Sequence, residues 1–377
     1  LAMIYDVIVV GAGPAGTSTA ILLAERGVRV ALIDKARFPR VKPCAEYANP
    51  EAMRVLGRLG ILDRVRESGA AVFSGIRVIA PGGAELELNY ARDAGRHALG
   101  ISRVRDITLA TNQAGVIRGT RGGASLTLRG RVIVGADGHH SAVSRLLGLD
   151  VPVRWPRRIG LAAHLEGFPL AGDLGEMHVG RDGYCGMAPQ EGGRVNAAMV
   201  VEMDAFERRD GSVEKFFDAA LRSYPGMAER VQQAVRVTPV RGVGPLARKV
   251  RNVSGHGFLL VGDAAGFFDP FTGEGIFDAL HGGELAAETL AKALERGDVS
   301  DAGLSSYREA RRRSFSAKRR AGWLVQAFVR SPALMDYAIT RLADRPHEAS
   351  TMTGVLGDYR EAGMMLSPRY LWRVLKP

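Results

Sequence analysis

The chain has few cysteines and no long apolar run. Only two cysteines, Cys44 and Cys185, occur in 377 residues. Two cysteines cannot form a disulfide framework, so a reducing, cytoplasmic location is expected. No apolar stretch reaches the roughly 18 residues that a membrane-spanning helix needs. A secretory leader is not expected either, because the first strand is predicted to start at Ile4, directly before a glycine loop.

Motifs of several enzyme classes are also missing. The sequence has no G-x-S-x-G, H-E-x-x-H or Walker A pattern, and no cluster of metal-binding residues, so no metal site is expected. No linker rich in serine, glycine or proline divides the chain. If two domains are present, they are therefore expected to interleave in sequence.

Basic residues outnumber acidic ones, with 51 Lys and Arg against 40 Asp and Glu and a formal net charge of +11. This balance fits a soluble basic enzyme or attraction to anionic partners such as NADPH or an acidic lipid surface. Nucleic acid is disfavoured, because no nucleic-acid-binding motif accompanies the charge. The densest basic stretch is predicted to be a helix at 308–320, with either a solvated face or a peripheral membrane contact.

The N-terminal 4–34 segment predicts one βαβ unit. The loop Gly11-Ala12-Gly13-Pro14-Ala15-Gly16 follows an apolar strand and opens a helix, which fits G-x-G-x-x-G. Its glycines permit a tight turn, approach of a pyrophosphate and close helix packing. The helix N-terminus favours phosphate, and Asp34 stands where a carboxylate accepts ribose hydroxyls. This loop alone does not separate FAD from NAD.

A second glycine-rich loop follows a buried strand at 257–263. Gly262-Asp263 lead into Pro270 and the pair Gly273-x-Gly275, and a helix is expected over about 275–296. The acidic side chain suits a ribitol hydroxyl, and the helix N-terminus at Gly275-Ile276 suits a flavin ring that gains negative charge. A third motif, Gly135-Ala136-Asp137-Gly138, also follows an apolar segment.

The remaining pattern predicts alternating sheet and helix. Helices are expected at 50–60, 103–111 and 213–224, and a strand pair is expected at 125–135. Short alternating runs over 155–203 predict a β-rich segment, which we interpret as a substrate sheet. The last 70 or so residues are predicted to be mostly helical.

The three motifs GAGPAG, GADGHHSAVSR and GDAAGFFDPFTGEGI, in this order, resemble the para-hydroxybenzoate hydroxylase superfamily. With KPCAEYANP at 42–50, the chain is most similar to the geranylgeranyl reductase family and related flavin monooxygenases and halogenases. The resemblance spans about 3–295. It implies an α/β fold with a Rossmann-like FAD-binding domain (3–75, 100–150 and 255–297) and a mostly parallel sheet. A β-sheet substrate domain (76–99 and 151–254) would interleave with it, followed by a helical region at 298–377.

The resemblance also implies roles for individual residues. Arg103 matches an arginine over the nucleotide half of FAD, and Asp137 lies in a motif that serves both flavin and nicotinamide nucleotides. The segment with Cys44, Ala45 and Tyr47 would pass the flavin ring. The expected cofactor contacts are Gly11, Gly13, Pro14, Ala15, Gly16, Asp34, Lys35, Cys44, Ala45, Tyr47, Arg103, Asp137, Gly262, Asp263, Pro270, Gly273, Gly275 and Ile276.

Departures from the family pattern bear on the reaction. The reductases read KPCGG where this chain has Ala45-Glu46, and they carry two bulky aromatics where it has Gly186 and Ala188. The stretch between Arg103 and Arg131 is also shorter than in the family. Either this edge of the domain is reduced in this protein, or the given chain lacks part of this region. The expected pocket residues are Tyr184, Gly186, Met187, Ala188 and Pro189.

The sequence therefore predicts an FAD-dependent oxidoreductase that takes electrons from NAD(P)H. Monooxygenation of a hydrophobic, aromatic or polyketide-like substrate is the favoured reaction, because the aromatics of the reductases are missing. Saturation of prenyl double bonds is the alternative, and a non-catalytic flavin-binding module is the alternative from another class. No catalytic side chain and no oligomeric state can be assigned at this stage.

Overall fold

The computed structural model describes residues 4–36, 38, 44–101, 117–121 and 124–376. It begins with the predicted βαβ unit: strand β1 (Ile4–Val10), helix α1 (Pro14–Ala24) and strand β2 (Val30–Ile33). The two strands pair in parallel, with Val7 opposite Val30. Gly13 is the N-cap of α1 and Pro14 its first residue, where a missing N–H costs nothing.

In the described chain, β1 lies inside a six-stranded sheet with the order β18-β19-β9-β1-β2, and β8 pairs with β9 at one end. The strands β1, β2, β9 and β19 are parallel, as expected for a Rossmann-like domain. The predicted strand pair at 125–135 is wrong, because β9 runs unbroken from Ala124 to Gly135. Gly130 stays in the ladder opposite Tyr5, so no turn forms there. The further bounds are β8 Ile117–Arg121, β18 Ser254–Gly255 and β19 Phe258–Leu260.

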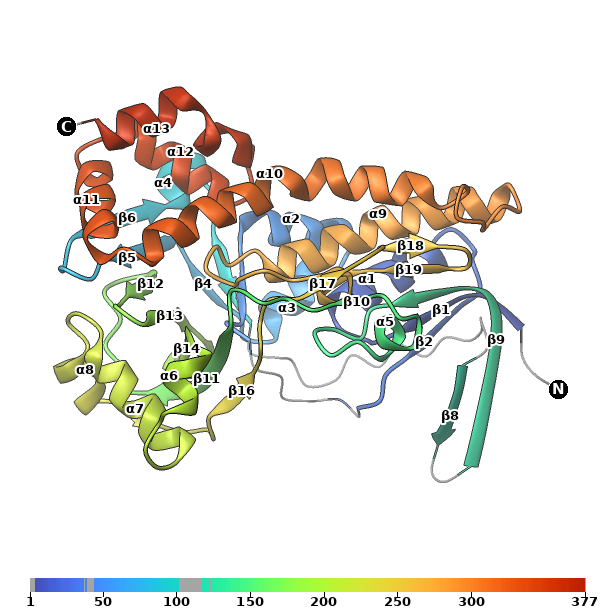
Figure 1. Ribbon diagram of the computed structural model, residues 1–377, viewed down its shortest axis with the longest axis horizontal. Helices are drawn as coiled ribbons and strands as arrows, with labels where there is room; N and C mark the ends of the chain where they lie inside the picture. The colour runs from blue at the N-terminus through green and yellow to red at the C-terminus, as the bar shows by residue number, and fades with distance from the viewer. Residues whose placement is uncertain (1–3, 37, 39–43, 102–116, 122–123, 377) are drawn as a thin grey trace.

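Two long helices cover this sheet. Helix α9 (Gly275–Glu295) packs on α1, and helix α10 (Ser305–Val329) runs beside α9 along the top of the molecule (Figure 1). The predicted helix from about 275 is confirmed. Valines of β1 and β9 form the core under α1 and α9 with alanines and leucines of the two helices, which shields one face of the parallel ladder.

A small three-stranded sheet joins the two parts of the fold. Its strands are β3 (Tyr47–Ala48), β7 (Ala98–Gly100) and β4 (Ala71–Phe73), in that order. The predicted helix over 50–60 is α2 (Pro50–Arg58), which Asn49 caps by accepting a hydrogen bond from the Ala52 amide. Helix α3 (Leu62–Glu67) follows it. The predicted helix at 103–111 lies outside the described residues.

The β-rich segment predicted at 155–203 forms most of an eight-stranded sheet, as far as the chain is described. Its order is β15-β11-β14-β13-β12-β5-β6, with β16 beside β11. Only β5 and β12 pair in parallel. The bounds are β5 Gly75–Ile79, β6 Glu85–Asn89, β11 Arg158–Glu166, β12 Leu174–Val179, β13 Gly183–Pro189, β14 Val195–Glu202, β15 Val235–Arg236 and β16 Arg241–Val243.

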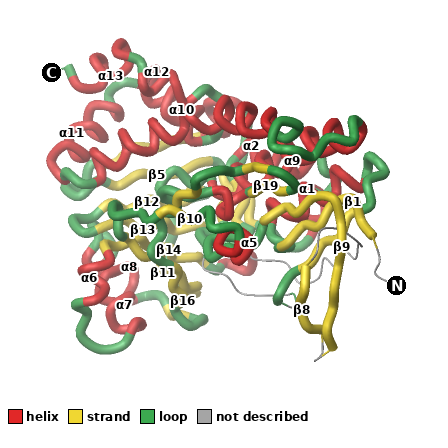
Figure 2. Tube along the Cα trace, turned by 45° about the vertical axis from the view of Figure 1, so that its right-hand side comes forward, coloured by secondary structure: helices red, strands yellow, loops and turns green. Residues whose placement is uncertain are grey.

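Helices cover parts of this sheet from different directions. Helix α7 (Val213–Ser223), which was predicted, and helix α8 (Ala228–Gln232) pack against one face of β11, β13 and β14. The helices α11 (Pro332–Ala343), α12 (Pro346–Leu356) and α13 (Pro368–Leu375) gather at the β6 end, as Figure 2 shows from a second direction. The predicted helical C-terminal region is therefore confirmed.

The shorter elements connect these layers. They are α4 (Tyr90–Ala94), α5 (Ala142–Leu146), α6 (Met203–Glu207), β10 (Asp150–Val151), β17 (Lys249–Val250) and the short 3-10 turns Glu191–Gly193, Gly262–Ala265 and Ala362–Leu366. Within the described ranges, no helix combines the length and the apolar character that crossing a membrane requires.

Candidate active site

The glycines of the first loop fall into two kinds. Gly11 has a φ of +107°, and a Cβ there would lie 2.4 Å from the Ala136 carbonyl oxygen; a Cβ on Gly16 would lie 1.8 Å from the Gly11 oxygen. Both positions need glycine for the fold itself. A Cβ on Gly13 would meet nothing within 4 Å. Gly13 thus leaves open space at the N-terminus of α1, where a phosphate would sit.

Asp34 orders the same loop from the end of β2. One of its carboxylate oxygens accepts a hydrogen bond from the Ala12 amide and the other from the Ala36 amide, each at 2.8 Å. Lys35, next along the chain, is exposed. Arg103 lies outside the described residues. Asp34 is therefore placed beside the loop, as a carboxylate that serves a ribose would be.

The second glycine-rich loop packs against the first one. Gly262 has a φ of +57°, and a Cβ there would lie 2.9 Å from the Ala15 Cβ, so Ala15 serves helix packing and faces this glycine. Gly273 (φ +69°) packs against the ring of Tyr47, whereas a Cβ on Gly275 would meet open space. The N-terminus of α9 is therefore open like that of α1. Asp263 and Pro270 are half-buried, and Ile276 packs on the core beneath α2.

The segment expected to pass the flavin ring lies beside Gly273. Cys44 and Ala45 are half-buried, and Tyr47 is buried with its hydroxyl 2.8 Å from that of Tyr90. Burial raises the pKa of Tyr47 well above its usual value, and Tyr90 adds to the effect. Tyr47 therefore presents a neutral ring, and its hydroxyl is held by a protein partner.

Asp137 lies two residues past the end of β9. One carboxylate oxygen accepts hydrogen bonds from the Ala142 and Val143 amides, at 2.6 and 3.2 Å, while Oδ1 is buried without a hydrogen-bond partner. His139, two residues further on, is half-buried, and its Nε2 lies 2.7 Å from the Pro245 carbonyl oxygen. Burial lowers the pKa of His139, against the opposing effects of that carbonyl and of Asp263.

A buried polar network ties the second loop to the eight-stranded sheet. Asp269 accepts hydrogen bonds from the hydroxyl of Tyr184 at 2.5 Å, from Gln326 at 2.8 Å and from Arg158 at 3.1 Å. The side chains of Arg158 and Asp269 are each 3% exposed. Tyr184 was predicted to line the pocket, but it is 2% exposed and joins loop to sheet. Burial, with Asp269 next to it, raises the pKa of Tyr184 well above its usual value.

The other predicted pocket residues on β13 divide between the two faces of the sheet. Gly186 and Ala188 share the face of Tyr184, which we call the open face. Met187 points to the opposite face, here called the packed face, where it is 1% exposed in the core beneath α7 and α8. The expectation that Met187 lines the pocket is therefore wrong, because neighbouring side chains on a strand point to opposite faces.

A strip of small residues crosses the middle of the open face. Gly186 lies between Met177 on β12 and Ala198 on β14, and Ala198 lies beside Ala162 on β11. These four residues are all half-buried, although they stand in central strands. A Cβ on Gly186 would meet only the Met177 methyl group at 3.5 Å and the Ala198 carbonyl oxygen at 3.8 Å, both at ordinary contact distance. Space thus remains above this strip, and Pro189 is half-buried at its end.

At one end of the strip, Glu46 spans the gap to the sheet. Its Oε2 atom lies 2.8 Å from Nε2 of His164 on β11, and its backbone has a φ of +53°, unusual for a residue with a side chain. Asn196 donates to the Cys44 carbonyl oxygen at 2.8 Å, and Gln190 donates to the Glu46 carbonyl oxygen at 3.5 Å. The side-chain oxygens of Asn196 and Gln190 are buried without partners.

Sequence reasoning missed this cluster for a clear reason. Glu46 and His164 are 118 positions apart, and only the exchange of a family glycine for Glu46 signalled anything unusual. Asn196 and Gln190 belong to no motif. The sheet register brings His164 opposite Asn196 and Asn196 opposite Ala188, which no local pattern reveals.

The residues present fit FAD. The N-termini of α1 and α9 both open onto free space, no acidic residue occupies the first turn of α1, and Asp137 Oδ1 lacks a partner. Gly13 and Asp34 would hold the nucleotide half, and Gly275 would lie beside the ring system. In the part of the chain that the structure describes, no group of His, Cys, Asp and Glu is suited to a metal ion.

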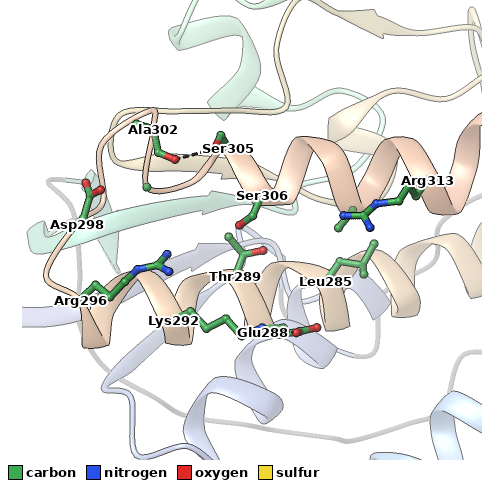
Figure 3. Close-up of a pocket in the computed structure, with 12 residues that line it drawn as sticks. Leu285, Glu288, Thr289, Lys292, Arg296, Asp298, Ala302, Ser305, Ser306 and Arg313 are labelled. Carbon is green, nitrogen blue, oxygen red and sulfur yellow. Dashed lines mark hydrogen bonds and ion pairs between the residues drawn. The ribbon is translucent and has the colours of Figure 1, made fainter.

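Another pocket lies far from these loops, at the distal ends of α9 and α10. Figure 3 shows Thr289 of α9 opposite Ser306 of α10, with Arg296 just past the end of α9. Lys292 is paired with Glu288 of the same helix at 2.6 Å. We call this the distal pocket, and none of the predicted site residues lines it.

Comparison with known proteins agrees with this assignment. The FAD binding domain family model matches residues 4–105 and 94–320. A curated digeranylgeranylglycerophospholipid reductase from Methanosarcina mazei is 29% identical over 78% of this chain and 77% of its own. A flavoprotein/dehydrogenase from Cytophaga hutchinsonii has a TM-score of 0.81 at 21% identity, covering 98% of this chain and 95% of that one.

The flavin-dependent brominase Bmp2 gives a TM-score of 0.79 at 19% identity, covering 97% of this chain and 98% of that one. Likeness to solved structures at these identities establishes the fold, and the family model establishes the cofactor class. Because that model spans most of the chain, the protein belongs to the FAD binding domain family and is an FAD-dependent oxidoreductase.

Proposed function

We propose that the protein is a monooxygenase that hydroxylates a hydrophobic, electron-rich aromatic or polyketide-like substrate with electrons from NAD(P)H. The observation that carries this proposal is the half-exposed strip of small residues on the open face. A planar ring needs a flat wall, and the strip supplies one because Gly186, Ala162 and Ala198 carry at most a methyl group. Pockets for such ligands are mostly apolar with a few placed polar groups.

Polar groups stand at one end of this wall. The unpartnered oxygens of Asn196 and Gln190 would accept hydrogen bonds from ring hydroxyls or amino groups. Leaving such an acceptor buried and unpaired costs on the order of 1–3 kcal/mol. A substrate that carries a hydrogen-bond donor would remove this energetic penalty. This favours a phenolic substrate over a pure hydrocarbon.

The pair of Glu46 and His164 would attract a proton of that substrate. It spans the loop and the sheet at 2.8 Å, with side chains 10% and 21% exposed. A ring hydroxyl held by Asn196 or Gln190 would lie at the same end of the strip. The pair would draw the hydroxyl proton toward the protein and so enrich the ring in electrons. When bound, FAD reduced by NAD(P)H supplies the electrons with which O₂ places one oxygen atom on the substrate and releases the other as water.

The same scaffold supports a second candidate, which the curated relatives favour. Their names identify reductases of digeranylgeranylglycerophospholipid, a prenyl lipid. The open face is apolar enough for a prenyl chain, and the flavin would then deliver a hydride to a double bond. The missing aromatics at Gly186 and Ala188 count against this reaction, and the unpartnered acceptors have no role in it.

Mass analysis of the product separates the two reactions. The flavin-loaded enzyme is given NADPH, ¹⁸O₂ and either a long-chain alkyl resorcinol or geranylgeraniol. The proposal expects one ¹⁸O atom in the resorcinol product and no reaction of the prenol. A gain of two hydrogens in the prenol, with no labelled oxygen in either product, would establish the reductase instead. Flavin reduction by NADPH without conversion of either substrate would contradict both.

A further inference from the structure

A second groove adjoins the flavin-facing loop from its other side. While Gly273 packs on Tyr47, the neighbouring residues Phe268 and Glu274 face a groove of about 540 Å³. We call it the proximal groove. Helix α10 forms one wall, and the segments around Trp155 and 247–253 form the other. It is separate from the open face of the sheet, although Gly275 at its edge also belongs to the expected flavin site.

The proximal groove carries a large excess of basic side chains. Most of them have acidic partners: Arg308 pairs with Asp301, Arg312 with Glu309, Arg248 with Asp150 and Lys318 with Asp278 and Asp358. This corrects the view of 308–320 as one solvated basic face, since Lys318 is mostly buried between two carboxylates. The remaining basic side chains lining the groove are Lys249, Arg311 and Arg319.

Arg311 and Arg319 have no ion pair among the described residues. They stand two turns apart on α10 and both line the groove. Nη1 of Arg311 is buried without a hydrogen-bond partner, and its guanidinium lies 4.9 Å from the ring centre of Phe315. Burial lowers the pKa of Arg319 and repulsion from Arg311 lowers it further, against the attraction of Asp278. Two guanidinium groups that line one groove without an ion pair favour the binding of an anion there.

The acidic residues of the groove do not supply that anion. Asp269 is held by Arg158, Tyr184 and Gln326, and Asp278 accepts from Lys318. Burial raises the pKa of Glu274 well above its usual value, against the attraction of Lys318. The local balance is therefore positive.

Aromatic side chains line the outer part of the same groove. The rings of Phe268 and Trp323 are 4.3 Å apart between centres, and those of Trp155 and Trp323 are 5.1 Å apart. Trp155 and Trp323 remain 38% and 47% exposed, although exposure of such rings is costly. Gly322 of α10 adds no side chain that would narrow the groove.

We propose that the proximal groove binds a phosphate group, held by Arg311 and Arg319, that belongs to a ligand with an apolar or aromatic body resting on Trp155, Phe268 and Trp323. Guanidinium groups suit phosphate because they donate two parallel hydrogen bonds. A nicotinamide nucleotide and an anionic lipid headgroup share this chemistry. In the distal pocket, Lys292 pairs with Glu288 and Arg313 with Glu309.

Binding measurements on the flavin-loaded protein test the site without reference to turnover. The probes are inorganic phosphate and NADP⁺ by calorimetry, and phosphatidylglycerol vesicles by co-sedimentation, with phosphatidylcholine vesicles as the uncharged reference. At least one phosphate probe is expected to bind, more weakly as salt rises. Arg319→Gln should raise its Kd tenfold or more, and Arg311→Gln should do the same. NADP⁺ binding that exceeds vesicle binding would identify a nucleotide, and the reverse order a lipid headgroup.

The adjacent arginine provides a matched control. Arg320→Gln removes the same charge one residue further along the helix, at an exposed position outside the groove. Its Kd should stay within twofold of the wild type, and flavin content and melting temperature should match in all three variants. Trp323→Ala should weaken binding of NADP⁺ or vesicles but leave inorganic phosphate unchanged. Equal losses in Arg319→Gln and Arg320→Gln, or no binding of any probe by the wild type, would overturn the proposal.

Discussion

The two faces of the eight-stranded sheet are built from alternate residues of the same strands, yet they differ in what covers them. On the packed face, Cys185, Met187 and Met199 lie at most 1% exposed beneath α7 and α8. On the open face, Gly186 and Ala198 are half-buried, and two side-chain oxygens lack partners. Packing that is complete on one side and incomplete over the strip on the other indicates that the strip is covered by ligands.

The largest effect is expected on the packed face. Met187→Ala removes a side chain that is 1% exposed and leaves a cavity, which should lower the free energy of unfolding by about 2–5 kcal/mol. Thermal and urea unfolding measure this loss. Flavin content and substrate KM of the folded variant should stay at wild-type values. A stable variant with altered substrate binding would show that Met187 lines the pocket after all.

Acid should weaken the packed face specifically. Burial by itself would raise the pKa of Glu176, but hydrogen bonds from His178 and Arg230 outweigh it and lower the pKa to about 2. Because the folded pKa is depressed, this stabilisation is present above the unfolded pKa near 4.5 and is lost as pH falls toward 2. It amounts to roughly 3 kcal/mol.

Glu176→Gln should therefore be less stable than the wild type at pH 7, and the gap should close progressively between pH 4.5 and 2. Melting temperatures recorded across that range provide the check. A gap that stays constant with pH would show that the carboxylate of Glu176 is not the stabilising group. A gap that widens in acid would reverse the predicted sign.

The contact between the eight-stranded sheet and the second glycine-rich loop should depend on one hydroxyl group. Tyr184→Phe removes the hydrogen bond to Asp269 and leaves that buried carboxylate with fewer donors, at a cost of about 1–3 kcal/mol. Because the loop moves with Asp269, FAD should also dissociate more readily, which flavin fluorescence measures. Tyr224→Phe is the matched control on the packed face, since the structure records no acceptor for its hydroxyl among the described residues. Equal changes in both variants would remove the special role of Tyr184.

Two substitutions of Glu46 should separate backbone strain from side-chain bonding. Glu46→Ala loses the hydrogen bond to His164 but keeps a side chain at a φ of +53°. Glu46→Gly loses the same hydrogen bond and relieves strain of about 1 kcal/mol. The glycine variant should therefore be more stable than the alanine variant by about 1 kcal/mol in urea unfolding. Identical stabilities would mean that the loop relaxes and stores no strain.

Local sequence patterns predicted the parts of the fold that depend on neighbouring residues. The βαβ unit, α2, α7 and α9 followed from glycine loops, caps and periodicity, because these signals act within a few residues. The continuous strand β9 was missed because Gly130 looks like a turn residue, whereas its pairing with Tyr5 keeps it extended. Strand alternation assigned Met187 to the packed face, although it had been grouped with the pocket.

The polar features of the site depend on distant contacts and were beyond local patterns. Asp269 meets Arg158 across 111 positions and Gln326 across 57. The basic stretch at 308–320 was visible in sequence, but which of its charges remain unpaired depends on acids such as Asp358 that fold back on it. Such pairings arise only once the sheet and the C-terminal helices are assembled.

The most direct test of the central claim, that the substrate lies on the open face beside the flavin, is the steady-state turnover of Gly186→Trp. The added ring should fill the space above the strip, because a Cβ there would meet nothing nearer than the Met177 methyl group at 3.5 Å. Flavin content, melting temperature and reduction of the flavin by NADPH should match the wild type, while kcat/KM falls tenfold or more. Ala302→Trp adds the same ring at an exposed position near the distal pocket and should change nothing. Unchanged turnover in Gly186→Trp, or loss of its flavin, would contradict the account.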